Sequence, residues 1–504
     1  MISFAHNNFA SYIENFRAKI ASIFSDRNNE NQLCLNRGLP PDILHQVLKE
    51  NPLKAFIPKE YGGGGGKIHE MLTLLETTSY QSLPLSLLLG INGGLFLQPI
   101  ANYAQEDAKK SIFQQFIERN KLGGLMITEP DYGSDALKMQ TSFLKTDNQY
   151  RISGTKHWAG LTGLADFWLI TAREKNETGD LGRDIGFFIH DSNNGGIEVE
   201  EYYNNLGLYM IPYGLNKVNI TVPAGYRLQP KTTGISMMLD LLHRSRLQFP
   251  GMATGFLHRL LDEAVAHCKA RFVGGKSLFN YDQVNDRLSH LQSYFTSSSA
   301  MSGYIAKNIP IGEDVSRFEV LANSVKSVVT DYMQEAAQSF LQLVGAKGYR
   351  LDHLAGRSVV DSRPFQIFEG SNDILYQQVA ESVLKKMRNM QITNLHEFLR
   401  SYPHTEKSLD HFKDMFSFEV DFKMSQRYLV QLGKAISRLI TMNLTIDIGL
   451  RGFNSDMITN SLKVLQNEVQ TILTSFKLKL APVVVDDYQD GSSWLNTLSP
   501  ADFR

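Results

Sequence analysis

The segment "YRISGTKHWAG", residues 150–160, decides the fold class, because its aromatic and β-branched residues are mixed with polar ones as in a half-buried β-strand. Four later segments have the same character and are bounded by Gly, Asn or Pro: "ADFWLITARE" (165–174), "DIGFFIHDSN" (184–193), "GIEVEEYY" (196–203) and "NKVNITVP" (216–223). The run of short strands predicts a β-domain over residues 125–235, built as a small barrel or a sandwich.

Helical patterns lie on both sides of this β-domain. Residues 1–124 contain "PPDILHQVLKENPL", which starts with prolines and puts Ile43, Val47 and Leu48 on one face. In residues 236–390, "VLANSVKSVVTDYMQEAAQSFLQLVG" is long enough for a bundle helix. Residues 391–504 are helical but more polar. We therefore expect a mostly helical α+β fold, with an N-terminal helical domain, a middle β-domain, a C-terminal four-helix bundle and a helical extension.

Composition excludes several classes of protein. The 504 residues carry a net charge of −1, which gives no sign of the excess positive charge typical of a nucleic-acid-binding protein. The two cysteines, Cys34 and Cys268, lie far apart, which argues against a disulfide framework and fits a reducing compartment such as the cytoplasm. The longest apolar run, residues 83–101, contains glycines and prolines that we expect to break it, so no transmembrane segment is predicted.

Common catalytic motifs are absent from the sequence. The histidines show no metal-ligand spacing, so we expect no metal site. The stretch "EYGGGGGK" (60–67) does not match the phosphate-loop pattern, and neither GxSxG nor GxGxxG occurs. A bound dinucleotide must therefore be held by a fold other than the Rossmann type.

The segment "PFQIFEGSNDILY", residues 364–376, places Glu369 between apolar residues and a Gly-Ser-Asn turn. In one interpretation it is a turn before a helix that starts near Asp373, with Ser371 or Asn372 as the N-cap. In the other, Glu369 is a general base, because poor solvation raises the proton affinity of a carboxylate. The segment by itself leaves both interpretations open.

Five segments, in this order, resemble motifs of the acyl-CoA dehydrogenase family. They are "FIPKEYGGGG" (56–65), "LMITEPDYGSDA" (125–136), "ISGTKHWAG" (152–160), "LQLVGAKGYRLDH" (341–353) and "FQIFEGSNDIL" (365–375). The strongest match is to the family's Thr-Glu-Pro-x-x-Gly-Ser-Asp. Order and spacing agree over about residues 35–388.

The resemblance implies FAD as the cofactor. The family's Thr-Glu-Pro threonine hydrogen-bonds the flavin ring, which assigns that role to Thr128. Further flavin contacts implied in the same way are Leu125, Ile127, Gly133, Ser134, Trp158, Gly160 and Ser371. At Gly160 the family usually has Thr or Ser, so only a backbone contact is expected there.

Other implied residues meet a neighbouring subunit or the substrate. Arg271, Leu278, Gln342 and Ala346 match residues that contact the FAD of a second subunit, which implies a homodimer or homotetramer. Arg246 and Ser134 match residues near the thioester arm, and Gly370 lets the backbone come close to the substrate.

The implied reaction is α,β-dehydrogenation of an acyl thioester to the trans-2-enoyl thioester, with an electron-transfer flavoprotein as acceptor. Glu369 takes the α-proton while the flavin N5 takes a hydride. Some family members carry their base on an earlier helix, at the position of Ser245, which cannot serve as a base. The alternatives are a flavin oxidase or monooxygenase on the same scaffold, or a non-catalytic interaction scaffold.

The sequence departs from the family at several positions. Gly274-Gly275 replaces Phe-Gly, and Asp282 replaces a flavin-binding Gln. Family arginines for the CoA nucleotide fall on Tyr376 and Glu381, and a family Asp falls on His243. These changes predict that the nucleotide is dispensable, so that an acyl-carrier-protein thioester is an alternative to acyl-CoA.

Overall fold

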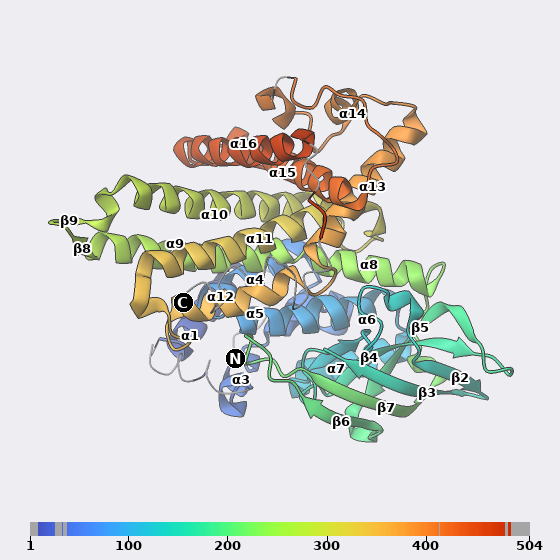
Figure 1. The fold of residues 1–504 in the computed structure, drawn as a ribbon. Coiled ribbons are helices and arrows are strands. Elements are labelled where there is room, and N and C mark those ends of the chain that lie inside the picture. The colour runs from blue at the N-terminus through green and yellow to red at the C-terminus, as the bar shows by residue number, and fades with distance from the viewer. Residues whose placement is uncertain (1–8, 26–32, 34–37, 413, 479–481, 485–504) are drawn as a thin grey trace, which may run out of the picture.

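The computed structural model describes residues 9–25, 33, 38–412, 414–478 and 482–484. The helical regions lie beside one β-domain, which is at one end of the molecule (Figure 1). Cys268 is buried and free, whereas Cys34 lies outside the described residues. The predicted α+β fold, mostly helical with a middle β-domain, a C-terminal helical bundle and a helical extension, is confirmed.

The N-terminal region is helical. Its helices are α1 (Phe9–Ile23), α3 (Pro41–Leu48), α4 (Ile68–Gln81), α5 (Leu83–Gly90), the π-helical segment η3 (Ile91–Leu97), α6 (Gln98–Tyr103) and α7 (Glu106–Arg119). In α3 the buried residues are Leu44, Val47 and Leu48.

The apolar run that we expected glycines and prolines to break is instead one continuous helical stretch, Leu83–Tyr103. Tertiary packing of this buried stretch outweighs the weak helix preference of glycine. At Gly93 the packing is so close that a Cβ would lie 2.3 Å from the Phe56 ring. By length and composition the stretch could cross a membrane, but 94% of its most apolar window is buried inside the protein. It is therefore packed as a core helix in this structure.

The β-domain is a seven-stranded sheet of order β1-β4-β2-β3-β7-β6, with β5 paired to β4. The strands are β1 (Gly123–Met126), β2 (Ser142–Thr146), β3 (Gln149–His157), β4 (Phe167–Lys175), β5 (Leu181–Asp191), β6 (Ile197–Tyr202) and β7 (Gly214–Pro223). Strand β3 pairs with β7 along its whole length, from Gln149–Pro223 to His157–Leu215. Because the pairing extends to His157, it fixes the position of the next residue, Trp158.

The C-terminal region is a helical bundle. It consists of α8 (Gly234–Arg246), α9 (Phe249–Ala270), the short hairpin β8–β9 (272–273 and 276–277), α10 (Asp282–Asn308), α11 (Glu319–Val344), α12 (Leu354–Ser362) and α13 (Asn372–Met390). Helix α9 packs against α4, α10 and α11, and α11 packs against α12 and α13. The hairpin lies at the opposite end of the bundle from the β-domain (Figure 1).

The extension forms α14 (Leu395–Ser401), α15 (Gln426–Leu450) and α16 (Ser455–Leu478). Helices α15 and α16 cover the bundle on the side of α10, α11 and α13 (Figure 1). Helix α15 buries a stripe that includes Leu432, Ile436, Leu439 and Ile440. The extension is therefore part of the hydrophobic core and is packed directly on helix α13, which follows the candidate base.

Candidate active site

Glu369 lies in a tight turn between the 3-10 segment Arg363–Gln366 and helix α13. Its φ is +54° and that of Gly370 is +93°, so two successive residues have left-handed backbone. This conformation is disfavoured for a residue with a side chain and persists at functional sites when the surroundings enforce it. Here a Cβ on Gly370 would come within 2.9 Å of Leu375, which explains the glycine.

The two carboxylate oxygens of Glu369 are in different situations. Ser245 Oγ donates a hydrogen bond of 2.8 Å to Oε1. Oε2 is buried and has no hydrogen-bond partner within the described part of the chain. Burial raises the pKa of Glu369, although the Ser245 hydrogen bond and the charges of Arg246 and Lys326 oppose the rise. The carboxylate thus has a free oxygen and increased basicity, which are the properties of a general base.

Two buried cations hold the backbone of this turn. Arg246 Nε donates to the carbonyl of Glu369 (3.0 Å), and Lys326 Nζ donates to the carbonyl of Gly370 (2.8 Å). Arg246 also donates to Asn323 Oδ1 at 2.8 Å. Burial lowers the pKa of Arg246 to about 10, and burial together with the Arg246 charge lowers that of Lys326 to about 7. The resemblance implied that Arg246 lies near the thioester arm; in this structure its guanidinium contacts the backbone of Glu369.

On the β-domain side, Trp158 follows strand β3 with a φ of +55°. The residue is 51% exposed, and its ring centroid lies 4.6 Å from that of Tyr203. The backbone N–H of His157 donates to the carbonyl of Thr128 (3.0 Å), so the end of β3 touches the Thr-Glu-Pro segment. Leu125, Ile127 and Thr128 are half-buried beside it. The structure thus brings these predicted flavin contacts to one face.

A buried ion pair fixes the Thr-Glu-Pro segment. Lys156 Nζ lies 2.9 Å from Glu129 Oε1, and both side chains are at most 5% exposed. Lys156 also donates to the carbonyl of Ile127 (2.9 Å), while Glu129 accepts the backbone N–H groups of Gln140 (2.6 Å) and Thr141 (2.9 Å). The Thr-Glu-Pro segment and the segment 152–160 are therefore joined by a salt bridge that sequence reasoning missed, although both partners lie inside the quoted motifs.

Tyr213 connects the two halves of the site. Its ring centroid lies 6.0 Å from that of Trp158, and burial and the charge of Glu369 both raise its pKa. A Cβ on Gly160 would lie 3.5 Å from the Tyr213 ring. Tyr213 therefore lies beside Trp158 and Gly160 and within the electrostatic range of Glu369. Tyr213 was also missed, and no motif in the sequence indicates it.

Other predicted residues lie apart from this face. Gly133 and Ser134 are exposed on the loop after the Thr-Glu-Pro segment. Arg271, Leu278, Gln342 and Ala346 belong to the hairpin end of the bundle, away from the β-domain (Figure 1). At this end of the bundle, burial lowers the pKa of His267, and the charges of Arg271 and Lys347 lower it further. Three basic residues therefore lie near one another there.

Residues at and after the turn serve different purposes. Ser371 is the N-cap residue of α13 but its side chain makes no cap hydrogen bond, so the expected cap is absent. Tyr376 is fully buried under α15, so its side chain is not available to contact a carrier.

His243 is also buried, and burial together with the charge of Arg246 lowers its pKa to about 3. Glu381 and Asp282 are exposed.

Three domain families match successive parts of the chain: acyl-CoA dehydrogenase N-terminal domain (residues 13–120), middle domain (124–218) and C-terminal domain (232–384). The chain belongs to the acyl-CoA dehydrogenase family. It is a FAD-dependent oxidoreductase that acts on CH–CH groups. Acyl-CoA dehydrogenase of Bacillus subtilis is 24% identical over 344 residues, which are 66% of this chain and 87% of that protein.

Two solved structures show how far the fold extends. Acyl-CoA dehydrogenase complexed with FAD from Bacillus anthracis covers 95% of this chain and 89% of its own, with a TM-score of 0.78 at 16% identity. The prolyl acyl-carrier-protein oxidase AnaB covers 75% of this chain and 99% of its own, with a TM-score of 0.67 at 17% identity. The Bacillus anthracis likeness therefore includes most of the extension.

The residues of this structure fit FAD. The half-exposed Trp158 ring, next to Thr128, Leu125 and Ile127, is an apolar surface that a flat ring system would cover. The basic groups at the hairpin end suit a pyrophosphate. Within the described residues no group of three potential metal ligands occurs.

Proposed function

We propose that this chain dehydrogenates an acyl thioester to its trans-2-enoyl thioester, with Glu369 as the base that removes the α-proton. The observation that carries the proposal is the carboxylate of Glu369. One of its oxygens is held by Ser245, and the other is buried without a partner among the described residues. An acidic side chain in such a setting favours accepting a proton.

The surrounding residues prepare Glu369 for this task. Arg246 and Lys326 hold the carbonyls of Glu369 and Gly370, so the side chain is presented from a fixed backbone. Ser245 leaves Oε2 as the oxygen that receives the α-proton. FAD, when bound against Trp158 and Thr128, supplies the acceptor for the β-hydrogen as hydride. Phe249, Phe365 and Phe368 pack together beside the turn and keep water from its apolar side.

The test is the isosteric variant Glu369→Gln in the flavin-loaded protein. Under anaerobic conditions, flavin bleaching by a saturated acyl thioester should slow by roughly 10²–10⁴-fold, the usual contribution of a general base. Flavin content and ligand binding should persist because the amide keeps size and shape. Asp373→Asn, an exposed carboxylate one turn away, is the matched control and should bleach like the wild type.

Two results would overturn the proposal. Bleaching of Glu369→Gln within a few-fold of the wild-type rate would show that another group is the base. A protein that stays colourless after incubation with FAD would support the interaction-scaffold alternative. The same assay should be run with acyl-CoA and with acyl-pantetheine, because neither Tyr376 nor His243 presents a cation to a CoA nucleotide. We expect comparable bleaching by both thioesters.

We further propose that the enzyme is a homo-oligomer in which each flavin contacts two chains. Support comes from Arg271 and Gln342, which lie at the end of the bundle opposite the β-domain (Figure 1). Because they lie far from Trp158 of their own chain, any flavin that they contact is one bound at Trp158 of a second copy of the chain. Co-expression of Glu369→Gln with Arg271→Ala should then restore activity, because a mixed dimer contains one site with both residues intact. If Arg271→Ala is inactive by itself and co-expression does not restore activity, Arg271 serves its own chain; if Arg271→Ala is fully active by itself, Arg271 serves no site.

A further inference from the structure

The extension is in direct backbone contact with the helix that follows the base. A Cβ added to Gly433 of α15 would lie 1.8 Å from the carbonyl oxygen of Tyr376 on α13. Only glycine permits this approach. Helix α15 is therefore fixed against the first turns of α13, close to the turn that carries Glu369 (Figure 1).

A carboxylate on α11, Asp331, whose side chain is 14% exposed, holds both ends of that turn. Its Oδ1 accepts hydrogen bonds from Gln366 Nε2 (2.8 Å) and Asn372 Nδ2 (2.7 Å). These are the residues three before and three after Glu369. One oxygen atom thus fixes the entry and the exit of the turn at the same time.

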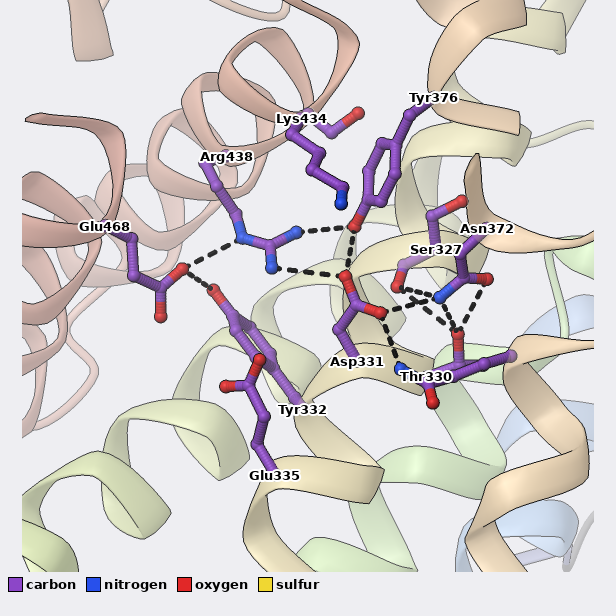
Figure 2. Close-up of polar contacts among 12 residues, drawn as sticks. Ser327, Thr330, Asp331, Tyr332, Glu335, Asn372, Tyr376, Lys434, Arg438 and Glu468 are labelled. Carbon is purple, nitrogen blue, oxygen red and sulfur yellow. Dashed lines mark hydrogen bonds and ion pairs between the residues drawn. The ribbon is translucent and has the colours of Figure 1, made fainter. Parts of the chain in front are cut away.

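The other oxygen of Asp331 faces the extension (Figure 2). Its Oδ2 accepts a hydrogen bond from the Tyr376 hydroxyl (2.6 Å) and lies 3.3 Å from Arg438 Nη2 of α15. Arg438 also donates to the Tyr376 hydroxyl (2.7 Å) and to Glu468 of α16 (2.9 Å). Burial alone would raise the pKa of Asp331, but the Arg438 charge and these hydrogen bonds hold it below its ordinary value.

A second connection reaches the turn from the same cluster. Asn372 Oδ1 accepts a hydrogen bond from Lys326 Nζ (2.9 Å), and Lys326 in turn donates to the carbonyl of Gly370 (2.8 Å). Thr330 Oγ1 bonds to the same amide group (Figure 2). The orientation of Asn372 is therefore transmitted to the residue directly after the base.

We propose that Arg438, on the C-terminal extension, is a positioning residue for Glu369. It neutralises Asp331, so that Asp331 remains an ionised acceptor for Gln366 and Asn372 on either side of the base. The role rests on the proposed function of Glu369 as base. Without Arg438, the largely buried Asp331 would take up a proton or admit water, and both ends of the turn would loosen.

The alternative is that Arg438 only fastens the extension to the bundle. It has contacts of that kind, because Glu468 also accepts a hydrogen bond from Tyr332 (3.1 Å). The two roles differ in their effect on chemistry. A fastening residue changes stability alone, whereas a positioning residue changes the rate and the acidity of the base in a protein that is still folded.

The experiment compares Arg438→Met with Arg438→Lys in the full-length, flavin-loaded protein. Anaerobic bleaching at saturating acyl thioester should slow by roughly 10–100-fold in Arg438→Met, the order expected for a misplaced catalytic group. Ligand binding should be nearly unchanged, because no substrate contact is removed. Arg438→Lys keeps the charge without the planar fork, so we expect an intermediate rate. Arg400→Met, which breaks an exposed ion pair with Asp410 elsewhere in the extension, is the matched control and should bleach like the wild type.

The pH profile separates positioning from fastening. A loosened turn admits water to Glu369, so the acid limb of the bleaching rate should move to lower pH, towards that of an ordinary glutamate. An unchanged rate and acid limb in Arg438→Met would overturn the proposal, even if the variant melts at a lower temperature. If Arg438→Met does not fold, Tyr376→Phe decides by the same two readouts, because it removes only the hydroxyl between Arg438 and Asp331. Failure of the base itself would show in Glu369→Gln, independently of Arg438.

Discussion

Two lysines are buried behind the two halves of the active site, and they are held in different ways. Lys156, behind the Thr128–Trp158 face, forms an ion pair with the buried Glu129. Lys326, behind the Glu369 turn, donates to two neutral oxygens, those of Gly370 and of the Asn372 side chain. Burial lowers the pKa of Lys156 to about 8; the added charge of Arg246 helps to lower that of Lys326 to about 7.

The difference separates a structural role from an electrostatic one. The charge of Lys156 is matched inside the β-domain by a carboxylate whose pKa it lowers against the effect of burial. The charge of Lys326 has no carboxylate in hydrogen-bond contact within the described chain, and instead acts on Glu369 across the turn. A buried cation with a paired acid holds a shape, whereas one without a directly paired acid influences the titration of its neighbours.

The largest expected effect is that of Lys156→Met. It leaves the Glu129 carboxylate buried without its counter-charge, which should lower the free energy of unfolding by about 3–5 kcal/mol. Flavin should be lost as well, because the Thr128 segment is released from β3. Urea unfolding followed by circular dichroism, together with flavin absorbance, measures both effects.

The matched control for that prediction is Lys121→Met. Lys121 pairs with Asp166 at 2.6 Å, but both side chains are about a quarter exposed, so the cost should be about 1 kcal/mol or less. If the two variants unfold at the same urea concentration, the Lys156 pair is not the support of the flavin face and the comparison fails.

A smaller effect, visible mainly in the pH profile, is expected for Lys326→Met. Burial raises the pKa of Glu369, and its protonated form cannot accept a proton, so the bleaching rate should fall as the pH is lowered. Below about pH 7 Lys326 is charged and favours the ionised base. Removing that charge should therefore move the acid limb to higher pH, the direction opposite to that expected for Arg438→Met.

Stopped-flow bleaching between pH 5 and about pH 8 tests this sign. Lys434→Met is the control, since Lys434 lies near the same helix but is only partly buried and pairs with the exposed Asp373 at 3.4 Å. An acid limb that moves to lower pH in Lys326→Met would show that the lysine acts by holding the Gly370 carbonyl, and that its charge is secondary.

Much of this molecule could be predicted from local patterns. Strand alternation around residues 150–160 and helical periodicity elsewhere were enough for the fold class, because both depend only on neighbours in the chain. The expected break in residues 83–101 was wrong, since tertiary packing of this buried stretch outweighs the local preference of its glycines. Position 376 matches a family arginine for the CoA nucleotide, and the burial of Tyr376 under α15 could not be read from the sequence.

The sequence by itself determined the order of the domains and the family motifs, and those motifs, together with the apolar neighbours of Glu369, singled it out as the candidate base. Only the tertiary structure decided which oxygen of Glu369 is free and what holds its turn. Ser245 reaches Glu369 across 124 residues, and Arg438 reaches Asp331 across 107. Periodicity and turn chemistry are local, whereas a buried hydrogen bond depends on which helices dock, and that is fixed only when the whole core packs.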